Sequence, residues 1–204
     1  MRKGTKSLFY SSFNPLPNDT ELGSRKIHVV DGGYLLHKVV WGRNQPFSAI
    51  FQKYVRYVQN HYGANAVVVF DGYPNSVEMK STKRMERARR ARVATSAEVM
   101  FSESMYSQVP QEKFLGNEKN KSRFISLLRA AFEQSHMTTI QAEEDADVLI
   151  VTTANSLSSK YDAVIIVGED IDLLVLLPTY ITKKLVKASH LTRCTPTNVL
   201  NTLK

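Results

Sequence analysis

The sequence is poor in cysteine and in long apolar runs. Its one cysteine, Cys194, excludes a disulfide within the chain and suits a reducing compartment. No apolar run approaches the roughly 20 residues needed to span a membrane, and the basic N-terminal stretch lacks the apolar core of a signal peptide. We therefore expect an intracellular protein, nuclear or cytoplasmic, with no membrane partner. Residues 1–26 are expected to form a polar extension, followed by one domain over residues 27–204 that ends incomplete.

Acidic residues are scarce in one segment, residues 79–92 (MKSTKRMERARRAR). It holds seven Lys or Arg and a single acid, a net charge of +6 out of the chain's +8, which leaves +2 for all other residues. A helix here would repel itself unless an external anion neutralised it, since it has almost no acids for pairing one turn away. It is predicted to bind phosphates, although a solvated face or a localisation signal is an open alternative. The predicted contacts are Lys80, Lys83, Arg84, Arg87 and Arg90.

Short β-branched runs alternate with helical patterns along the rest of the chain. The runs lie at residues 27–31, 66–70, 137–141 and 163–167, with a possible fifth at 180–186. Near-continuous apolar strands separated by helices predict an α/β fold, with an open, mostly parallel sheet of about five strands and helices on both faces. Helices are expected at residues 47–62, 122–135 and 143–157, and a short one after Thr195-Pro196. Residues 95–120 are expected to form a long loop or arch.

Each predicted strand is followed by acidic side chains. Asp31 and Asp71 end two strands, an acidic run at 143–147 follows the third, and Asp170 and Asp172 follow the fourth. The carboxyl ends of parallel strands share one edge, where ligands bind in open α/β sheets. Taken singly, these acids are as readily explained as turn or helix-capping residues. Together they predict a site where a cation offsets their mutual repulsion.

Helical spacing narrows the acidic run to Glu144 and Asp147. In a helix over 143–157 these two acids share a face with Val148 and Val151, the face expected to pack on the sheet. Glu143 is the reserve, and Asp145 points elsewhere. A donor set of oxygens alone suits Mg²⁺ or Mn²⁺, as one or two ions. Two such ions would clamp the attacking and leaving oxygens of a phosphodiester displacement.

The motifs VVDGGYLLH, VFDGYP, EEDADVLI and GEDIDLL, with the basic segment after the second, resemble the PIN-like superfamily. The similarity is greatest to its flap-endonuclease branch of structure-specific 5′ nucleases, and it covers about residues 27–177. The resemblance implies a PIN-like fold with a basic helical arch and a two-metal phosphodiesterase. The acids that match the family's metal-site motifs are Asp31, Asp71, Glu144, Asp147, Asp170 and Asp172.

The chain also departs from the family pattern. Ala146 stands where many members have a second acid, and the family's last Asp and its C-terminal DNA-binding motif are not found before Lys204. Lys83 and Arg84 fall near the basic residues at the base of the family's arch. Tyr34 and Tyr73 directly follow the first two strand-end acids and are predicted either to stack on a base or simply to pack.

The sequence therefore predicts a metal-dependent, flap-endonuclease-like nuclease acting on DNA or RNA, single-stranded or flapped. The alternative is a catalytically impaired nucleic-acid-binding or scaffold domain on the same fold. A third option, an α/β phosphohydrolase with Asp31 as nucleophile, leaves Asp170 and Asp172 unexplained. The oligomeric state and the choice between endo- and exonuclease activity stay open.

Overall fold

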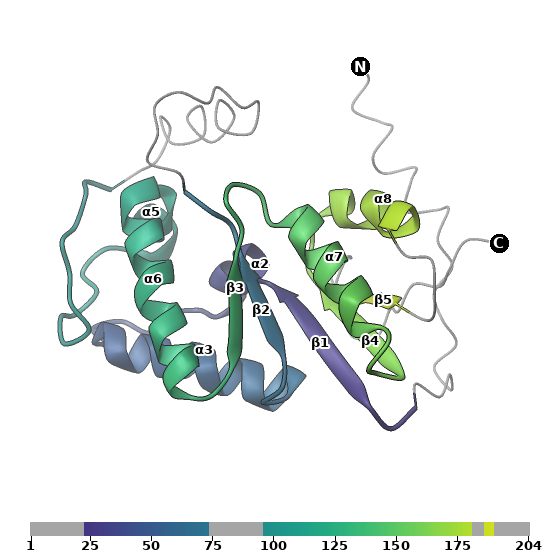
Figure 1. Cartoon of the computed structure of the whole chain (residues 1–204). Coiled ribbons are helices and arrows are strands. Elements are labelled where there is room, and N and C mark those ends of the chain that lie inside the picture. Colours follow the sequence, from purple (N-terminus) through teal and green to yellow (C-terminus); the bar gives the residue numbers. More distant parts are fainter. Residues whose placement is uncertain (1–22, 74–95, 181–185, 190–204) are drawn as a thin grey trace, which may run out of the picture.

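The computed structural model describes residues 23–73, 96–180 and 186–189, which are built around one parallel β-sheet (Figure 1). Its five strands lie in the order β3-β2-β1-β4-β5, and every neighbouring pair is parallel. The strands are β1 (Lys26–Asp31), β2 (Val67–Phe70), β3 (Thr138–Gln141), β4 (Ala163–Val167) and β5 (Val186–Ser189). The predicted α/β fold, an open parallel sheet with helices on both faces, is confirmed.

The first four strands form where β-branched runs predict them. Val67–Phe70 is buried at every position, because the second strand is covered on both faces. The fifth strand differs from the prediction. Residues up to Tyr180 belong to a helix, residues 181–185 lie outside the described part of the chain, and β5 begins at Val186 beside Val164 of β4.

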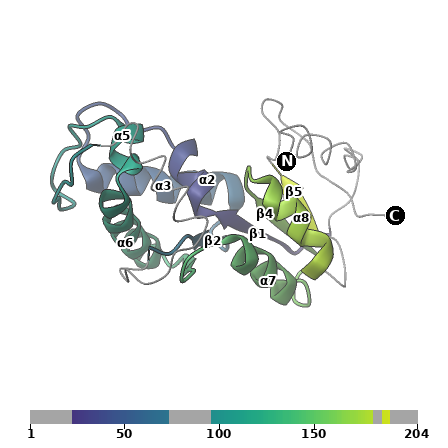
Figure 2. The same cartoon turned by 90° about the horizontal axis from the view of Figure 1, so that it is seen from above.

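One face of the sheet is covered by four helices, which form the larger apolar core (Figure 2). Aromatic side chains fill this core. The rings of Trp41 and Phe124 stack with centroids 4.9 Å apart, and those of Phe47 and Phe101 lie 4.1 Å apart. The four helices are α2 (Gly32–Lys38), α3 (Phe47–Tyr62), α5 (Gln111–Gly116) and α6 (Glu118–Gln134).

The opposite face carries α7 (Asp147–Leu157) and α8 (Ile171–Tyr180). Alternate residues of the strands point to this side, among them Val29 and Ile166, and pack against Ile150 and Val151 of α7. Leu173 in the first turn of α8 is only 1% exposed and belongs to the same cluster. This second core fixes the starts of α7 and α8 at the carboxyl edge of the sheet.

The helix predictions are confirmed for α3 and need correction elsewhere. α3 has the predicted bounds and ends at Gly63, whose φ of 93° suits glycine. α6 begins at Glu118, earlier than predicted. The expected long loop over 95–120 is wrong for its described part, since this stretch contains α5 and buries Phe101 in the core.

Helix α7 starts later than its acidic sequence predicts. Glu143 to Ala146 lie before the helix, which begins only at Asp147. The predicted shared face is therefore wrong for Glu144 and for Val148, which is 43% exposed, whereas Val151 is buried as expected. The cause is a set of contacts between this stretch and the end of β2, described below.

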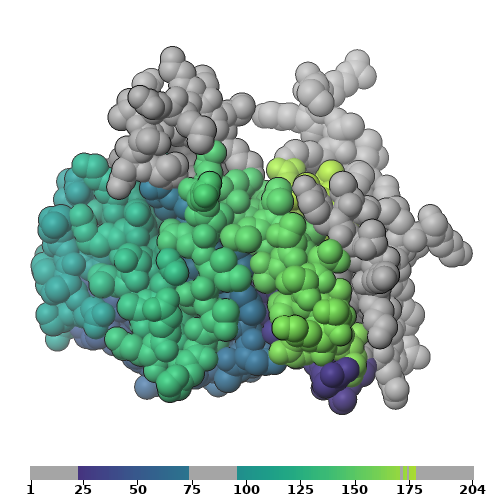
Figure 3. Space-filling view, viewed as in Figure 1, coloured from purple at the N-terminus to yellow at the C-terminus, as the bar shows by residue number. Residues whose placement is uncertain are grey.

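The strand order places a topological switch point beside β1. From β1 the chain adds β2 and β3 on one side, then returns to place β4 and β5 on the other. In open α/β sheets, ligands bind outside the carboxyl ends of the strands at such a point. Both α7 and α8 begin at this edge. The space-filling view, seen from the same direction as Figure 1, shows the surface formed by α6, β3 and α7 (Figure 3). Within the described ranges, every helix is too short or too polar to cross a membrane.

Candidate metal centre

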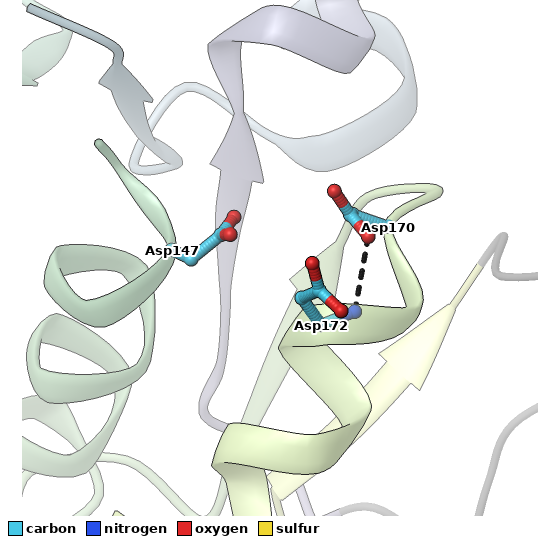
Figure 4. Close-up of side chains that lie close together, drawn as sticks. All are labelled: Asp147, Asp170 and Asp172. Carbon is cyan, nitrogen blue, oxygen red and sulfur yellow. Dashed lines mark hydrogen bonds between the residues drawn. The ribbon is translucent and has the colours of Figure 1, made fainter. Parts of the chain in front are cut away.

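Three aspartates from two elements converge at the switch point. Each of Asp147, Asp170 and Asp172 offers a carboxylate oxygen, and these oxygens lie within 4.8 Å of one another. Asp147 is the first residue of α7 and is 9% exposed, whereas Asp170 and Asp172 lie at the start of α8 and are more accessible. Figure 4 shows the Asp147 side chain directed across β1 toward the other two. Like charges this close repel one another, so the arrangement favours a bound cation.

The local backbone holds the pair on α8 in place. The Asp172 amide donates to the Asp170 carboxylate over 3.0 Å, a turn that precedes the helix and presents both carboxylates on one side (Figure 4). Leu173 follows immediately and anchors the turn in the apolar core. The hydrogen-bonded turn at Asp170–Asp172 and the buried side chain of Leu173 directly after it explain why two acids lie next to a buried strand.

Asp31 is the last residue of β1, the strand that lies between β2 and β4. Its carboxylate accepts from the Gly33 amide over 2.7 Å, which caps α2. Burial raises the pKa of Asp31 to about 7, helped by the negative charge of Asp71 and, less strongly, of Asp147, against the opposing pull of backbone amides. Asp31 therefore couples electrostatically to Asp147 and belongs to the same acidic edge.

Gly168 has no Cβ atom, and this leaves space for the Asp31 side chain. A Cβ atom at this glycine would lie 3.3 Å from the Asp31 Cβ and 2.8 Å from a methyl group of Leu173. The close approach of β4 to the end of β1 therefore depends on glycine at this position. Gly168 was not among the predicted site residues, because a lone glycine after a strand gives no sequence signal that distinguishes this role.

Asp71 and Glu144 take part in hydrogen bonds that join the end of β2 to the connection between β3 and α7, and they lie outside the group of three. Asp71 accepts from the Ala146 amide over 3.1 Å, and the Glu144 carbonyl accepts from the Gly72 amide over 2.9 Å. Of the six predicted metal-site acids, the structure brings Asp147, Asp170 and Asp172 within ligand distance of one another. It places Asp31 beside them, and the ligand roles of Asp71 and Glu144 stay predictions.

The two predicted stacking tyrosines differ in exposure. Tyr34 is 7% exposed and packs in the larger core, with the Lys38 ammonium 5.7 Å from its ring centre. This burial favours the packing role that the sequence analysis left open for it. Tyr73 is half-buried, and the ammonium of Lys121 lies 5.6 Å from its ring centre. The position of Lys121 on α6 gave no sequence signal.

Several predicted features lie outside the described residues. They are the N-terminal extension except for residues 23–26, the helix after Thr195-Pro196, and the whole predicted phosphate-binding set of Lys80, Lys83, Arg84, Arg87 and Arg90. The described chain stops at Tyr73 and resumes at Ser96. Tyr73 lies two residues after Asp71, so the basic segment follows the acidic edge directly in sequence.

The chain resembles solved structures of DNA-processing nucleases. It matches the D15 protein of bacteriophage T5, crystallised with metal ions, at 20% identity and a TM-score of 0.49, over 80% of this chain and 53% of that one. It matches the catalytic core of Rad2 in complex with DNA substrate at 17% identity and a TM-score of 0.49, over 96% and 51%. The Holliday junction-resolving enzyme GEN1, with product DNA and Mg²⁺, is similar at 16% identity and a TM-score of 0.32, over 85% and 31%.

These solved structures are the kind of 5′ nuclease that the sequence motifs resemble. Each likeness lies below 25% identity and below a TM-score of 0.5, so it does not by itself assign this chain to their family. The chain spans about half the length of the T5 and Rad2 proteins and less of GEN1. No protein-family profile matches the chain, and no curated protein sequence is significantly similar to it. The function proposed below therefore rests on the residues of this chain.

Proposed function

We propose that this chain is a divalent-metal-dependent nuclease that hydrolyses phosphodiester bonds of DNA or RNA, single-stranded or flapped. The observation that carries the proposal is the convergence of Asp147, Asp170 and Asp172 at the switch point of a parallel sheet. The catalytic region would lie within residues 27–204, with residues 1–26 as a polar extension.

The residues at this edge fit a hard divalent cation. The three aspartates offer only oxygen atoms, the donors that Mg²⁺ and Mn²⁺ prefer, and at least two of them reach solvent. Asp31 would serve the same centre, because a bound cation would favour its ionised form and so oppose the burial and the Asp71 charge that raise its pKa to about 7. Asp71 and Glu144 would complete the set if a second ion binds.

The chain's own residues would divide the work between holding the metal and holding the nucleic acid. The aspartates fix the cation at the edge, and the turn at Asp170 and Asp172 keeps both carboxylates oriented toward Asp147. The basic segment supports the proposal through its charge of +6 and its place in the sequence shortly after Asp71. A bound divalent cation would supply Lewis-acid stabilisation of the charge that develops on the phosphate.

Incubation with defined substrates tests the proposal. Purified protein with Mg²⁺ or Mn²⁺ should cut labelled flapped or single-stranded DNA or RNA, and EDTA should abolish the cleavage. Asp170→Asn should lower the rate by about 100-fold or more, by loss of a metal ligand. Asp162→Asn is the matched control. Asp162 pairs with Arg25 beside the first residue of β4, at the end of the strand away from the three aspartates, so this substitution should leave the rate unchanged.

The non-catalytic alternative makes a different prediction in the same experiment. A nucleic-acid-binding or scaffold domain would bind these substrates with salt-dependent affinity, would cut none of them with either metal, and would bind equally well after Asp170→Asn. That combination of results would overturn the nuclease proposal.

A further inference from the structure

Gln141, the last residue of β3, connects helix α6 to the end of β2. Its side-chain amide donates to the main-chain carbonyl of Asp71 over 3.1 Å. Its side-chain carbonyl accepts from the Arg129 guanidinium over 2.8 Å. One neutral side chain therefore uses a donor and an acceptor at once, and it meets Asp71 through the main chain, leaving the carboxylate to other partners.

Arg129 is itself held in position along α6. Its Nε donates to the Thr139 hydroxyl over 3.3 Å, and its Nη2 lies 3.8 Å from the Glu133 carboxylate one turn further on. The guanidinium is thus aligned by two neighbours before it meets Gln141. A half-buried, pre-oriented arginine restricts the rotamer of Gln141 far more than solvent would.

Beside Gln141, the end of β2 and residues 142–146 are joined by three further hydrogen bonds. The Ala142 amide donates to the Phe70 carbonyl over 2.9 Å, and the Gly72 amide donates to the Glu144 carbonyl over 2.9 Å. The Asp71 carboxylate accepts from the Ala146 amide over 3.1 Å. A Cβ at Gly72 would lie 2.1 Å from the Glu143 carbonyl oxygen, so the two backbones are in close contact.

These contacts determine where α7 begins. They hold residues 143–146 outside the helix, and Asp147 follows as the first helical residue with its side chain toward Asp170 and Asp172. A shift of the β2 end relative to β3 would move the Ala146 amide and, with it, the Asp147 carboxylate. Metal sites tolerate such movement poorly, because the groups that orient a ligand affect affinity about 10- to 100-fold.

We infer that Gln141, backed by Arg129, is a positioning residue that sets the Asp147 carboxylate in the metal centre by locking the Asp71 carbonyl. This inference rests on the proposed metal-dependent function. It assigns a positioning role to a side chain outside the predicted acidic set, and it gives a reason for a glutamine at the end of β3, beside the point where Asp71 follows β2.

Two variants distinguish the hydrogen bond from Gln141 to the Asp71 carbonyl from the hydrogen bond that Gln141 accepts from Arg129. Gln141→Leu removes both hydrogen bonds, whereas Gln141→Glu keeps an acceptor for Arg129 and loses the donor to Asp71. Gln111→Leu is the matched control, because the Gln111 amide likewise donates to main-chain carbonyls, those of Leu36 and Val39, on the other side of the fold. All three substitutions should lower the melting temperature, since each removes a half-buried amide contact.

Hydrogen exchange in metal-free protein tests the positioning directly. Exchange at the Gly72 and Ala146 amides should rise about 10-fold in both Gln141 variants and stay at the parent rate in Gln111→Leu. Unchanged exchange in both Gln141 variants would overturn the inference, whatever the metal does.

Mn²⁺ titration, followed by electron paramagnetic resonance well below each melting temperature, tests the consequence. The Gln141 variants should bind Mn²⁺ about 10-fold more weakly than the parent and Gln111→Leu. Equal affinity in all four proteins would overturn the inference while leaving the nuclease proposal standing. Faster exchange combined with no Mn²⁺ binding by the parent would instead overturn the proposed metal-dependent function, and the inference with it.

Discussion

At the scale of single residues, the protein places several carboxylates where their charges oppose folding. Asp147, Asp170 and Asp172 lie within ligand distance of one another, and half-buried Asp31 is close enough to Asp71 for that charge to raise its pKa. Structural roles explain part of this, since Asp31 caps α2 and Asp71 binds the Ala146 amide. A divalent cation held among Asp147, Asp170 and Asp172 would offset the repulsion between their carboxylates.

Asp172→Asn should therefore separate folding from metal binding. Without divalent cations the variant should stay folded, because the Asp172 amide still donates to the Asp170 carboxylate at the start of α8. Mn²⁺ at about 100 times its dissociation constant should stabilise the parent by about 2.7 kcal/mol. The variant should lose most of this gain.

The same substitution at Asp162 provides the control. Asp162→Asn breaks an exposed ion pair with Arg25 and should keep the full Mn²⁺-induced shift in melting temperature. If Mn²⁺ stabilises the Asp172 variant as much as the parent, these aspartates do not hold the metal.

The raised pKa of Asp31 predicts the pH dependence of the metal-free protein. Since its folded pKa is about 7 and its usual value is 3.8, the folded state binds the proton more tightly than the unfolded state. The contribution of Asp31 to the free energy of unfolding is fully present below about pH 4. It is lost as the pH rises toward and through 7, and amounts to on the order of a few kcal/mol. Urea unfolding between pH 4.5 and 8 measures it.

Asp31→Asn should flatten this pH profile and make the metal-free protein more stable than the parent at pH 8. Saturating Mg²⁺ should flatten the profile of the parent in the same way, because the cation favours the ionised carboxylate. A parent whose stability rises steadily with pH over this range, unchanged by Asp31→Asn, would contradict the assignment.

Ala146 shows what a residue without a carboxylate contributes at the acidic edge. Its lack of a carboxylate raised the question of a lost metal ligand. In the structure its side chain is 2% exposed among the apolar residues that cover the sheet, and its amide is the part that serves the site. An acid at this position would be buried in apolar surroundings, so alanine here is consistent with an intact centre.

At the scale of elements, the local sequence pattern was enough to predict the first four strands and the helix α3, but not the fifth strand or the start of α7. The β-branched runs and the periodicity of α3 are properties of neighbouring residues. The start of α7 depends on Asp71 and Gly72, which lie more than seventy residues away and hold 143–146 outside the helix. The acidic residues 143–147 resemble a helix N-terminus, and their sequence gives no signal for these long-range contacts.

The packing of helix α8 on the sheet should affect metal binding, because it holds the turn that carries Asp170 and Asp172. Leu173→Ala removes a side chain that is 1% exposed and should cost about 2–5 kcal/mol in the free energy of unfolding. It should also weaken Mn²⁺ binding, because Leu173 directly follows the Asp170–Asp172 turn. Denaturant unfolding and Mn²⁺ titration measure the two effects.

Val175→Ala on the same helix is the matched control. Val175 is 46% exposed, so its truncation should change stability by about 0.5 kcal/mol or less and leave Mn²⁺ affinity unchanged. Equal effects of the two substitutions on Mn²⁺ binding would show that packing of α8 does not position the aspartates.

At the scale of the whole molecule, charge is segregated along the chain. The acids meet at one sheet edge, while +6 of the total +8 lies in residues 79–92. The acids after the predicted strands indicate that edge from sequence alone, because the carboxyl ends of parallel strands lie together. The strand order, which puts β1 between β2 and β4 and creates the switch point, depends on packing between distant segments and has no local signature.

The basic segment should supply the salt-dependent part of nucleic-acid binding. Lys83→Gln combined with Arg84→Gln should weaken binding to single-stranded DNA and lower the slope of log affinity against log salt by about 1 to 2. Fluorescence anisotropy between 50 and 300 mM KCl measures this slope. The equally charged control, Arg56→Gln with Lys160→Gln, should leave it unchanged, and an equal loss of slope in both would point to net charge alone.

Anomalous diffraction from crystals soaked in Mn²⁺ tests the central claim most directly. The account predicts an anomalous peak bounded by carboxylate oxygens of Asp147, Asp170 and Asp172, at distances of about 2.0–2.3 Å. The peak should vanish in crystals of Asp172→Asn. Saturating Mn²⁺ that gives no peak at this edge, or a peak that persists unchanged in the variant, would contradict the account.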